Sequence, residues 1–344
     1  MAGKQHVLAA QEAIAEAIYL KDLDFTDIYI SETGEAFMRG LSDVADPIYD
    51  IPENAIQDLD MVHKKVCGLG QLEREFVLDH DEVRYRVTKI QGDTSATYHV
   101  RRSMFPIPRI GKLGINPMVV RALGTIGHPG AANVPRGSGL ILVAGATGQG
   151  KTTTASSLLQ EYLITYGDIA ITIEDPPELK LEGMHGKFGR CFQTRVIGGD
   201  FAPYLRAALR QMPRFILLGE IRDPSSASEV LNAALSGHVV IATIHGGSIE
   251  EALTRVIKYV QSNLDAELAR SMLADGIAAV VHQEMRRIRA NDGRVARRIF
   301  AESLFFGHDK GLRQKIRDGK IVQLSSDIDL QKSRMDRGEM PVSR

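Results

Sequence analysis

The sequence is poor in cysteine and has no tryptophan. Its two cysteines, Cys67 and Cys191, lie far apart and outside any Cys-x-x-Cys pair, so we expect neither a disulfide scaffold nor a cysteine zinc site. This usage fits a reducing cytoplasm. The chain also has no uncharged apolar run of the ~18 residues that a membrane-spanning helix needs, and its first residues, interrupted by Gln11, Glu12 and Glu16, lack the apolar core of a signal peptide. Any membrane role is therefore expected to come through partners.

A large excess of one charge is missing too. Lys and Arg number 42 and Asp and Glu number 43, for a net charge of −1. That balance argues against a protein held to nucleic acid by bulk positive charge, and the missing tryptophan weakens a base-stacking surface. Direct nucleic-acid binding is therefore not expected. The 344 residues, 44% hydrophobic and 25% charged, are typical of a globular chain long enough for two domains of ~150 residues each.

A complete phosphate-binding motif occupies residues 145–152. The apolar run 140–144 fits a buried strand, and Gly-Ala-Thr-Gly-Gln-Gly-Lys-Thr then matches G-x-x-x-x-G-K-[ST] and leads into a helix. An unrelated loop with this spacing is the alternative, but strand, loop and helix all agree with the motif. The glycines let the backbone curl around an anion, Lys151 reaches the β- and γ-phosphates, and the Thr152 hydroxyl can ligate magnesium. The predicted nucleotide-binding residues are Gly145, Ala146, Thr147, Gly148, Gln149, Gly150, Lys151, Thr152 and Thr153.

Three further short apolar runs, 169–173, 215–218 and 239–244, alternate with helical segments, which predicts a parallel sheet. Ligands of such sheets bind outside the carboxyl ends of the strands. Glu174 follows the first run directly, Glu220 follows the second after one glycine, and His245 follows the third. We therefore expect an NTPase site at this edge of the sheet.

Each of these polar residues has a chemical role and a structural alternative. Glu220 stands where phosphate-loop proteins place the acid that holds magnesium through water, although Asp is more usual there and a solvated carboxylate is the alternative. Glu174 is a candidate for orienting or deprotonating the attacking water, unless it or Asp175 merely caps the following turn. His245 is a candidate donor to the γ-phosphate and His238 precedes the same strand, with a packing or surface histidine as the alternative for both.

The nucleotide class follows from motifs that are missing. No Asn-Lys-x-Asp is present to select guanine, and Leu-Ser-Gly-His at 235–238 lacks the Gly-Gln that would complete a transporter signature. ATP hydrolysis is the better prediction.

The first third of the chain is predicted to be a small α+β module. Helical spacing marks 7–20 and 56–69, and strand patterns mark 27–31, 36–40, 83–90 and 97–102. Prolines and glycines concentrate between 105 and 139, which indicates a linker and the entry to a second domain with a short helix near 118–123. Apolar residues after His308 predict docked C-terminal helices. We place the first domain at 1–110, a linker at 111–116 and the second domain at 117–344.

Four motifs together resemble those of the type II/IV secretion and type IV pilus ATPases. Residues 145–152 match the Walker A motif of that family, 173–176 its aspartate box, 218–223 its Walker B motif with glutamate, and 237–245 its histidine box. The resemblance extends from about Gly114 to the C-terminus, and 27–30 is a weaker match to a strand of the N-terminal domain. It implies a RecA-like α/β ATPase domain with a parallel sheet, preceded by a small α+β, PAS-like domain.

The resemblance also implies roles, residue by residue. Glu174 becomes the base that activates water and Glu220 the magnesium acid, while His245 and His238 become phosphate-sensing or ring-coupling groups. The implied cofactors are ATP and Mg²⁺, and the implied assembly is a homohexameric ring. Inner-membrane secretion or pilus platform proteins are the implied partners, with the ring in the cytoplasm and held to the inner membrane through them.

In this family, arginines from the N-terminal domain complete sites near the joint of the two domains. Arg101 and Arg102 resemble those arginines, with Arg84, Arg86 and Arg109 as reserves. An arginine that arrives on closure couples hydrolysis to domain motion. A solvated basic strand is the alternative.

The branch of the family is indicated by two departures. The tetracysteine zinc insert of many type II and pilus-assembly members is absent, and residues 312–320 only partly resemble a helix motif of retraction motors. We favour an export motor of the Dot/Icm or IncI-conjugation (type IVB) kind, with a pilus retraction ATPase as the alternative. A RecA-type DNA motor and a nucleotide-gated binding switch are less favoured.

Overall fold

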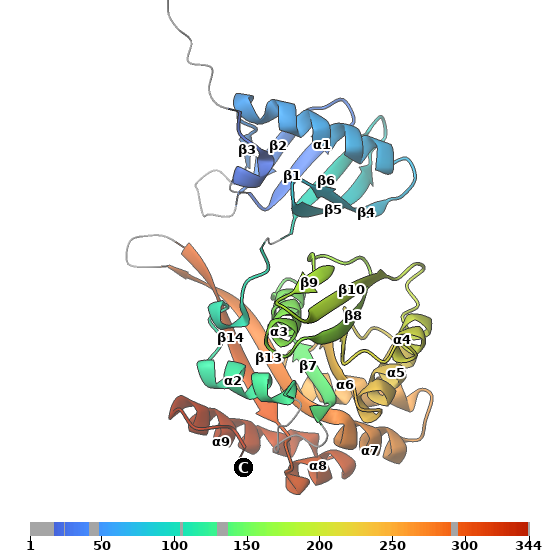
Figure 1. Ribbon diagram of the computed structural model, residues 1–344, viewed down its shortest axis with the longest axis vertical. Helices are drawn as coiled ribbons and strands as arrows, with labels where there is room; N and C mark the ends of the chain where they lie inside the picture. The colour runs from blue at the N-terminus through green and yellow to red at the C-terminus, as the bar shows by residue number, and fades with distance from the viewer. Residues whose placement is uncertain are drawn as a thin grey trace, which may run out of the picture. The chain divides into compact units, whose positions relative to one another are not determined.

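The computed structural model describes residues 17–23, 25–40, 48–103, 106–128, 137–289 and 295–342, without the side chains of 287, 289 and 295–297. The chain divides into two compact units, Met1–Arg102 and Ser103–Arg344 (Figure 1). The sequence placed the first boundary at residue 110 and a linker at 111–116. In the structure this proline-rich stretch also carries apolar side chains, and Ile107, Ile110 and Ile115 are buried in the core of the second unit.

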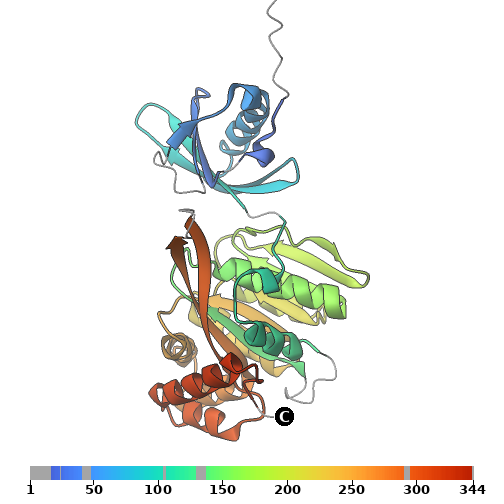
Figure 2. The ribbon, with the colours of Figure 1, turned by 90° about the vertical axis from the view of Figure 1, so that its left-hand side faces the viewer.

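The first unit is an antiparallel sheet with the strand order β3-β2-β1-β6-β5-β4. The helix α1 lies across one face of it (Figure 2). Its apolar side chains Leu59, Val62 and Val66 recur at helical spacing and pack against the strands. The elements are β1 (Asp27–Ser31), β2 (Ala36–Arg39), β3 (Ile48–Asp50), α1 (Ile56–Leu69), β4 (Glu75–His80), β5 (Val83–Gln91) and β6 (Ala96–Arg102), with 3-10 helices at Leu20–Asp22 and Glu53–Ala55.

The expected strands 27–31, 36–40, 83–90 and 97–102 are β1, β2, β5 and β6, and the expected helix 56–69 is α1. The strands β3 and β4 were not predicted. Of the helix expected over 7–20, residues 7–16 lie outside the described residues, and the end of that stretch enters the 3-10 helix Leu20–Asp22.

The second unit is a three-layered α/β domain, as expected. Its sheet has the order β14-β13-β7-β12-β11-β8-β10-β9, in which the neighbours from β13 to β10 pair in parallel. The elements are α2 (Pro117–Ile126), β7 (Gly139–Ala144), α3 (Lys151–Tyr166), β8 (Asp168–Glu174), β9 (Gly183–His185), β10 (Gly189–Arg195), α4 (Ala202–Leu209), β11 (Phe215–Leu218), α5 (Pro224–Leu235), β12 (Val239–Ile244), α6 (Ile249–Gln261), α7 (Ala266–Gly276), β13 (Ile277–Arg289), β14 (Val295–Phe305), α8 (Lys310–Arg317) and α9 (Ser325–Asp336), with 3-10 helices at Ile110–Lys112 and Ile321–Leu324.

Alternate residues of the central strands face two separate cores. In β7, Leu140 and Leu142 join the core under α4–α8, whereas Ile141 and Val143 join the core under α2 and α3. Both faces of the strand are therefore covered by helices, which is why the strand reads as a continuous apolar run. The parallel sheet predicted from the four apolar runs is confirmed.

Candidate functional site

The phosphate loop connects β7 to α3 at the carboxyl edge of the sheet. Its three glycines, Gly145, Gly148 and Gly150, have φ of 155°, 77° and 76°, a region that other residues rarely adopt. A Cβ atom on Gly145 would also lie 2.5 Å from the main-chain oxygen of Gln283 on β13. The loop therefore needs glycine both for its backbone and for its close approach to the neighbouring strand.

Lys151, the first residue of α3, is held inside the curve of this loop. Its Nζ donates to the main-chain oxygens of Gly145 and Ala146, each at 2.9 Å, and the residue is 8% exposed. Burial lowers the pKa of Lys151, while the carboxylates of Glu220 and Glu178 act in the opposite direction. Glu178 was not singled out from the sequence.

Glu174 is the last residue of β8 and is almost fully buried. Thr172 Oγ1 donates to its Oε1 at 2.6 Å, and Gln193 Nε2 donates to the same oxygen at 3.1 Å. Gly219 packs against it, because a Cβ at position 219 would be in van der Waals contact with the Glu174 Cγ, at 3.4 Å. Glu174 is therefore a buried carboxylate that two side-chain donors hold in place.

Glu220 and His245 follow the neighbouring strands β11 and β12 and meet each other. His245 Nε2 lies 2.9 Å from Oε1 of Glu220, and Arg222 Nε donates to its Oε2 at 2.8 Å. Arg222 also lies 3.8 Å from Asp175, so a chain of charged groups crosses the ends of these strands. Glu220 is therefore part of a network and is not a lone solvated carboxylate.

His238 is not brought to this site. It precedes β12, its Nδ1 lies 2.6 Å from the main-chain oxygen of Pro213, and its own oxygen accepts from Gly139 N at the start of β7. The six residues of β12 separate it from His245, a span of ~20 Å at the rise of a strand. This position excludes direct contact of His238 with a phosphate bound at the loop of the same chain. The histidine-box match implied a phosphate-sensing or ring-coupling role, and ring coupling by His238 stays a prediction.

The candidate arginines of the first unit have partners within that unit. Arg101 Nε donates to Asp27 Oδ1 at 2.8 Å, an oxygen that His99 Nε2 also approaches to 2.7 Å. Arg102 donates to the main-chain oxygens of Lys21 and Leu23. Of these two arginines, Arg101 is the one with a carboxylate partner. Its side chain is 61% exposed, so it is also accessible to solvent.

The reserve arginines are also paired. Arg84 donates to both carboxylate oxygens of Asp79, and Arg86 lies 3.4 Å from Glu75. Arg109 belongs to the second unit, where its Nε and NH2 donate to the two carboxylate oxygens of Glu161 on α3, both at 2.7 Å. A further bond joins the same segments, from Gln160 Nε2 to the main-chain oxygen of Ile107.

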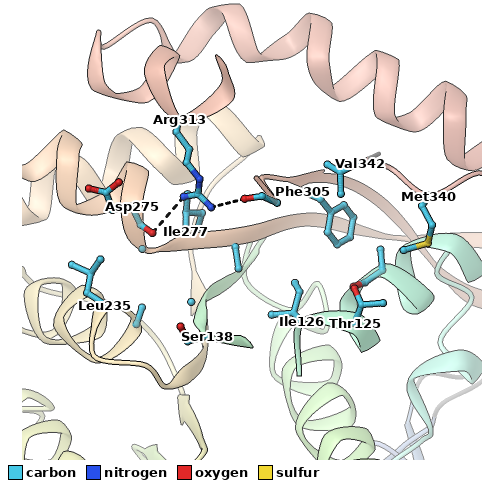
Figure 3. Close-up of a pocket in the computed structure, with 16 residues that line it drawn as sticks. Thr125, Ile126, Ser138, Leu235, Asp275, Ile277, Phe305, Arg313, Met340 and Val342 are labelled. Atoms are coloured by element: carbon cyan, nitrogen blue, oxygen red, sulfur yellow. Dashed lines mark hydrogen bonds between the residues drawn. The ribbon is translucent and has the colours of Figure 1, made fainter. Parts of the chain in front are cut away.

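A cavity of about 470 Å³ lies at the opposite edge of the sheet (Figure 3). It is bounded by the start of β7, the ends of α2 and α5, and the junction of α7 with β13. Arg313 reaches its rim and donates to the main-chain oxygens of Ala274, Asp275 and Gly307, so it ties three segments together. None of the cavity's lining residues belongs to the phosphate loop or the charged network.

The residues present fit a magnesium ion of the phosphate-loop kind. Mg²⁺ prefers oxygen ligands and keeps several waters, so it needs only one or two protein groups. The Thr152 hydroxyl and the Glu220 carboxylate are of the right type. Among the residues that the structure describes, no cluster of three or more His, Cys, Asp or Glu forms a metal site of another kind.

Sequence reasoning missed the groups that support the acids. Thr172 and Gln193 hold Glu174, and Gln193 Oε1 also accepts from the amides of Leu181 and Glu182. Thr172 was within reach of a sequence argument, because residues two apart on a strand point to the same side. Gln193 comes from a strand that was not predicted.

Within the described ranges, no helix is both long and apolar enough to cross a membrane.

Comparisons with known proteins agree with this fold. The chain is 31% identical over 261 residues to the type IV pilus retraction ATPase PilT of Pseudomonas aeruginosa, covering 75% of this chain and 70% of the relative. The crystal structure of the pilus retraction motor PilT with bound ADP superimposes with a TM-score of 0.70 at 26% identity, covering 91% of this chain and 90% of that one. The ATPase DotB of Legionella pneumophila has the same fold, with a TM-score of 0.67 at 21% identity over 93% of this chain and 90% of that one. Residues 60–318 match the family described as Type II/IV secretion system protein, and the chain belongs to that family, as its motifs predicted.

Proposed function

We propose that the chain binds ATP with Mg²⁺ and hydrolyses it. The observation that carries this proposal is the meeting of four strand ends at one edge of the sheet. In the strand registers, Ala144 lies beside Ile244, and Leu218 lies between Ile173 and Ala242. The phosphate loop, Glu174, Glu220 and His245 are therefore delivered to one place, as a phosphoryl-transfer site requires.

Each group has a role in this reaction. Lys151 and the loop amides bind the β- and γ-phosphates. Thr152 and Glu220 would hold a hydrated magnesium ion, which would neutralise phosphate charge. Glu174 orients the attacking water and accepts its proton. His245, next to Glu220, donates to the γ-phosphate. Hydrolysis by the purified chain that depends on Mg²⁺ and falls in chelator is the direct test.

We further propose that the active form is a homohexameric ring, in which an arginine of the first unit completes a nucleotide site. Arg101 is the first candidate because its guanidinium is largely exposed while Asp27 fixes its position. If rings hydrolyse ATP, specific activity rises with protein concentration. A flat dependence down to low concentration favours a monomeric nucleotide-gated switch instead.

The proposed machine is an export system of the type IVB kind, to which the cytoplasmic ring attaches through inner-membrane proteins. Pilus retraction is the second candidate, and the 31% identity to PilT of Pseudomonas aeruginosa favours it. Affinity capture of the Glu174→Gln protein with ATP from host membranes distinguishes them. Secretion-channel or transfer proteins support export, and pilins with a pilus platform protein support retraction. Stimulation of hydrolysis by DNA would favour a DNA motor over both.

A further inference from the structure

β13 runs beside β7 and then continues along the phosphate loop. The ladder between the two strands ends where His282 pairs with Ala144. The next residues of β13 face the loop, since the main-chain oxygen of Gln283 would touch a Cβ on Gly145. The segment 283–285 therefore forms one wall of the loop.

Two hydrogen bonds join this wall to Gln149, in the middle of the loop. Gln283 Nε2 donates to the main-chain oxygen of Gln149, and Met285 N donates to its side-chain Oε1, both at 2.5 Å. Gln149 is thus held through its backbone and through its side chain. It lies between Gly148 and Gly150, two glycines with positive φ and therefore conformationally free positions of the loop.

Fold stability alone does not account for glutamine at position 283. The residue is fully buried, and its Oε1 has no hydrogen-bond partner among the residues that the structure describes. A buried acceptor without a partner destabilises a fold, so packing alone would favour an apolar side chain of similar size, such as methionine. The bond that Gln283 does make goes to the phosphate loop.

We propose that Gln283 is a positioning residue for the nucleotide, and that Gln283 and Gln149 form a latch that presets the phosphate loop. This inference rests on the proposed binding of nucleotide at the loop. Loop amides bind phosphate well only when they already point inward, because ordering them during binding costs free energy. The latch fixes the flexible middle of the loop against a strand that is part of the sheet, so the amides are ordered before phosphate arrives.

The test uses the full chain with ADP and Mg²⁺ in titration calorimetry. Gln283→Met is expected to bind ADP about tenfold more weakly, the loss that corresponds to one buried hydrogen bond. Its melting temperature without nucleotide is expected to stay equal to that of the unmodified chain, because the unpartnered acceptor is removed as well. Gln149→Ala removes the other bond, from Met285 N to the Gln149 side chain, and is expected to weaken ADP binding similarly.

Gln331 provides a matched control within the same unit. It is also a buried glutamine, and its amide group bonds to a strand backbone through Phe305 N at 2.9 Å and Phe305 O at 2.8 Å. Those bonds join α9 to β14 and do not involve the loop. Gln331→Met is expected to melt at a lower temperature and to bind ADP with unchanged affinity.

The outcomes separate the latch from the proposed function. Unchanged ADP affinity in Gln283→Met or in Gln149→Ala overturns the latch. If Gln283→Met does not fold, Gln149→Ala alone decides, because its side chain is only partly buried. Failure of the unmodified chain to bind ADP overturns the proposed function and the latch with it.

Discussion

His245 Nε2 lies 2.9 Å from Oε1 of Glu220, at the ends of two adjacent parallel strands. The same strand β12 carries His238 at its other end, where that ring contacts the main chain of Pro213. The chain thus offers two histidines on one strand, one inside the charged network and one outside it.

His245→Ala should therefore lower kcat for ATP by about tenfold or more, the usual scale for losing one donor to developing charge. His238→Ala should leave kcat within about twofold, although it loses a hydrogen bond and some stability. Steady-state hydrolysis by the two purified variants checks this. Equal losses in both would contradict the placement of His238 outside the site.

Substitutions of Lys151 and Glu174, the two central residues of the proposed mechanism, should affect nucleotide binding and turnover differently. Lys151→Ala should lose hydrolysis together with most nucleotide affinity, because the lysine supplies charge to the phosphates inside the loop. Glu174→Gln should bind ATP normally and turn over about 10²- to 10⁴-fold more slowly, since an amide has the same shape but accepts no proton. Binding by calorimetry and turnover by phosphate release distinguish them. Normal turnover in either variant would contradict the assignment of that residue to the catalytic site.

Thr172 is expected to act through Glu174. Thr172→Val keeps the shape of a fully buried side chain and removes the 2.6 Å bond to the carboxylate. We expect kcat to fall about tenfold while the affinity for ADP stays constant, because misplacing a base affects the chemical step. Thr172→Ser restores the hydroxyl and should restore most of the rate. If serine and valine behave alike, the hydroxyl is not what positions Glu174.

The stability of the first unit should depend on the ionisation of Asp27. Burial alone would raise the pKa of Asp27, but the hydrogen bonds from Arg101, Thr26 and His99 outweigh it and hold the pKa below its usual range. The resulting stabilisation is present above the ordinary carboxyl pKa of about 4 and is lost as pH falls through the lower, folded value. Asp27→Asn should lower the free energy of unfolding by about 2 kcal/mol at neutral pH and by progressively less in stronger acid. Urea unfolding followed by circular dichroism between about pH 3 and pH 7 measures this.

Asp79→Asn is the control for that experiment. Asp79 pairs with Arg84 on the same sheet, but its side chain is 47% exposed. Exposed ion pairs contribute little, so we expect a change below about 1 kcal/mol at all pH values. If the loss in free energy of unfolding caused by Asp27→Asn does not become smaller in acid, the carboxylate charge is not what stabilises the unit.

The parts of the fold that were predictable have a common physical cause. Strands covered on both faces, such as β7 and β12, are continuous apolar runs and were found with nearly correct ends. β13 was missed because Gln283, Glu284 and Arg286 interrupt its apolar pattern where it runs past the end of β7. The phosphate loop and the three polar residues predicted at the strand ends, Glu174, Glu220 and His245, lie at one edge of the sheet because the carboxyl ends of parallel strands share that edge.

The supporting residues were harder to predict, because they become neighbours only through the sheet. Gln193 reaches Glu174 because β10 pairs with β8, and that pairing cannot be read from either segment alone. The position of His238, by contrast, could have been predicted from the sequence. It precedes its strand, which already places it at the amino edge, but its motif match outweighed that signal.

The bidentate pair between Arg109 and Glu161 has a mechanical consequence. α3 begins at the lysine that would grip phosphate and carries Glu161 further along its length, and Arg109 lies a few residues after the point where the first unit ends. Because a helix is stiff along its axis, a small displacement of its first turn would also move Glu161 and, through the ion pair, Arg109. The ion pair therefore ties the segment that follows the first unit to the helix that begins at the phosphate loop, so that Arg109 and Lys151 are linked through one rigid element.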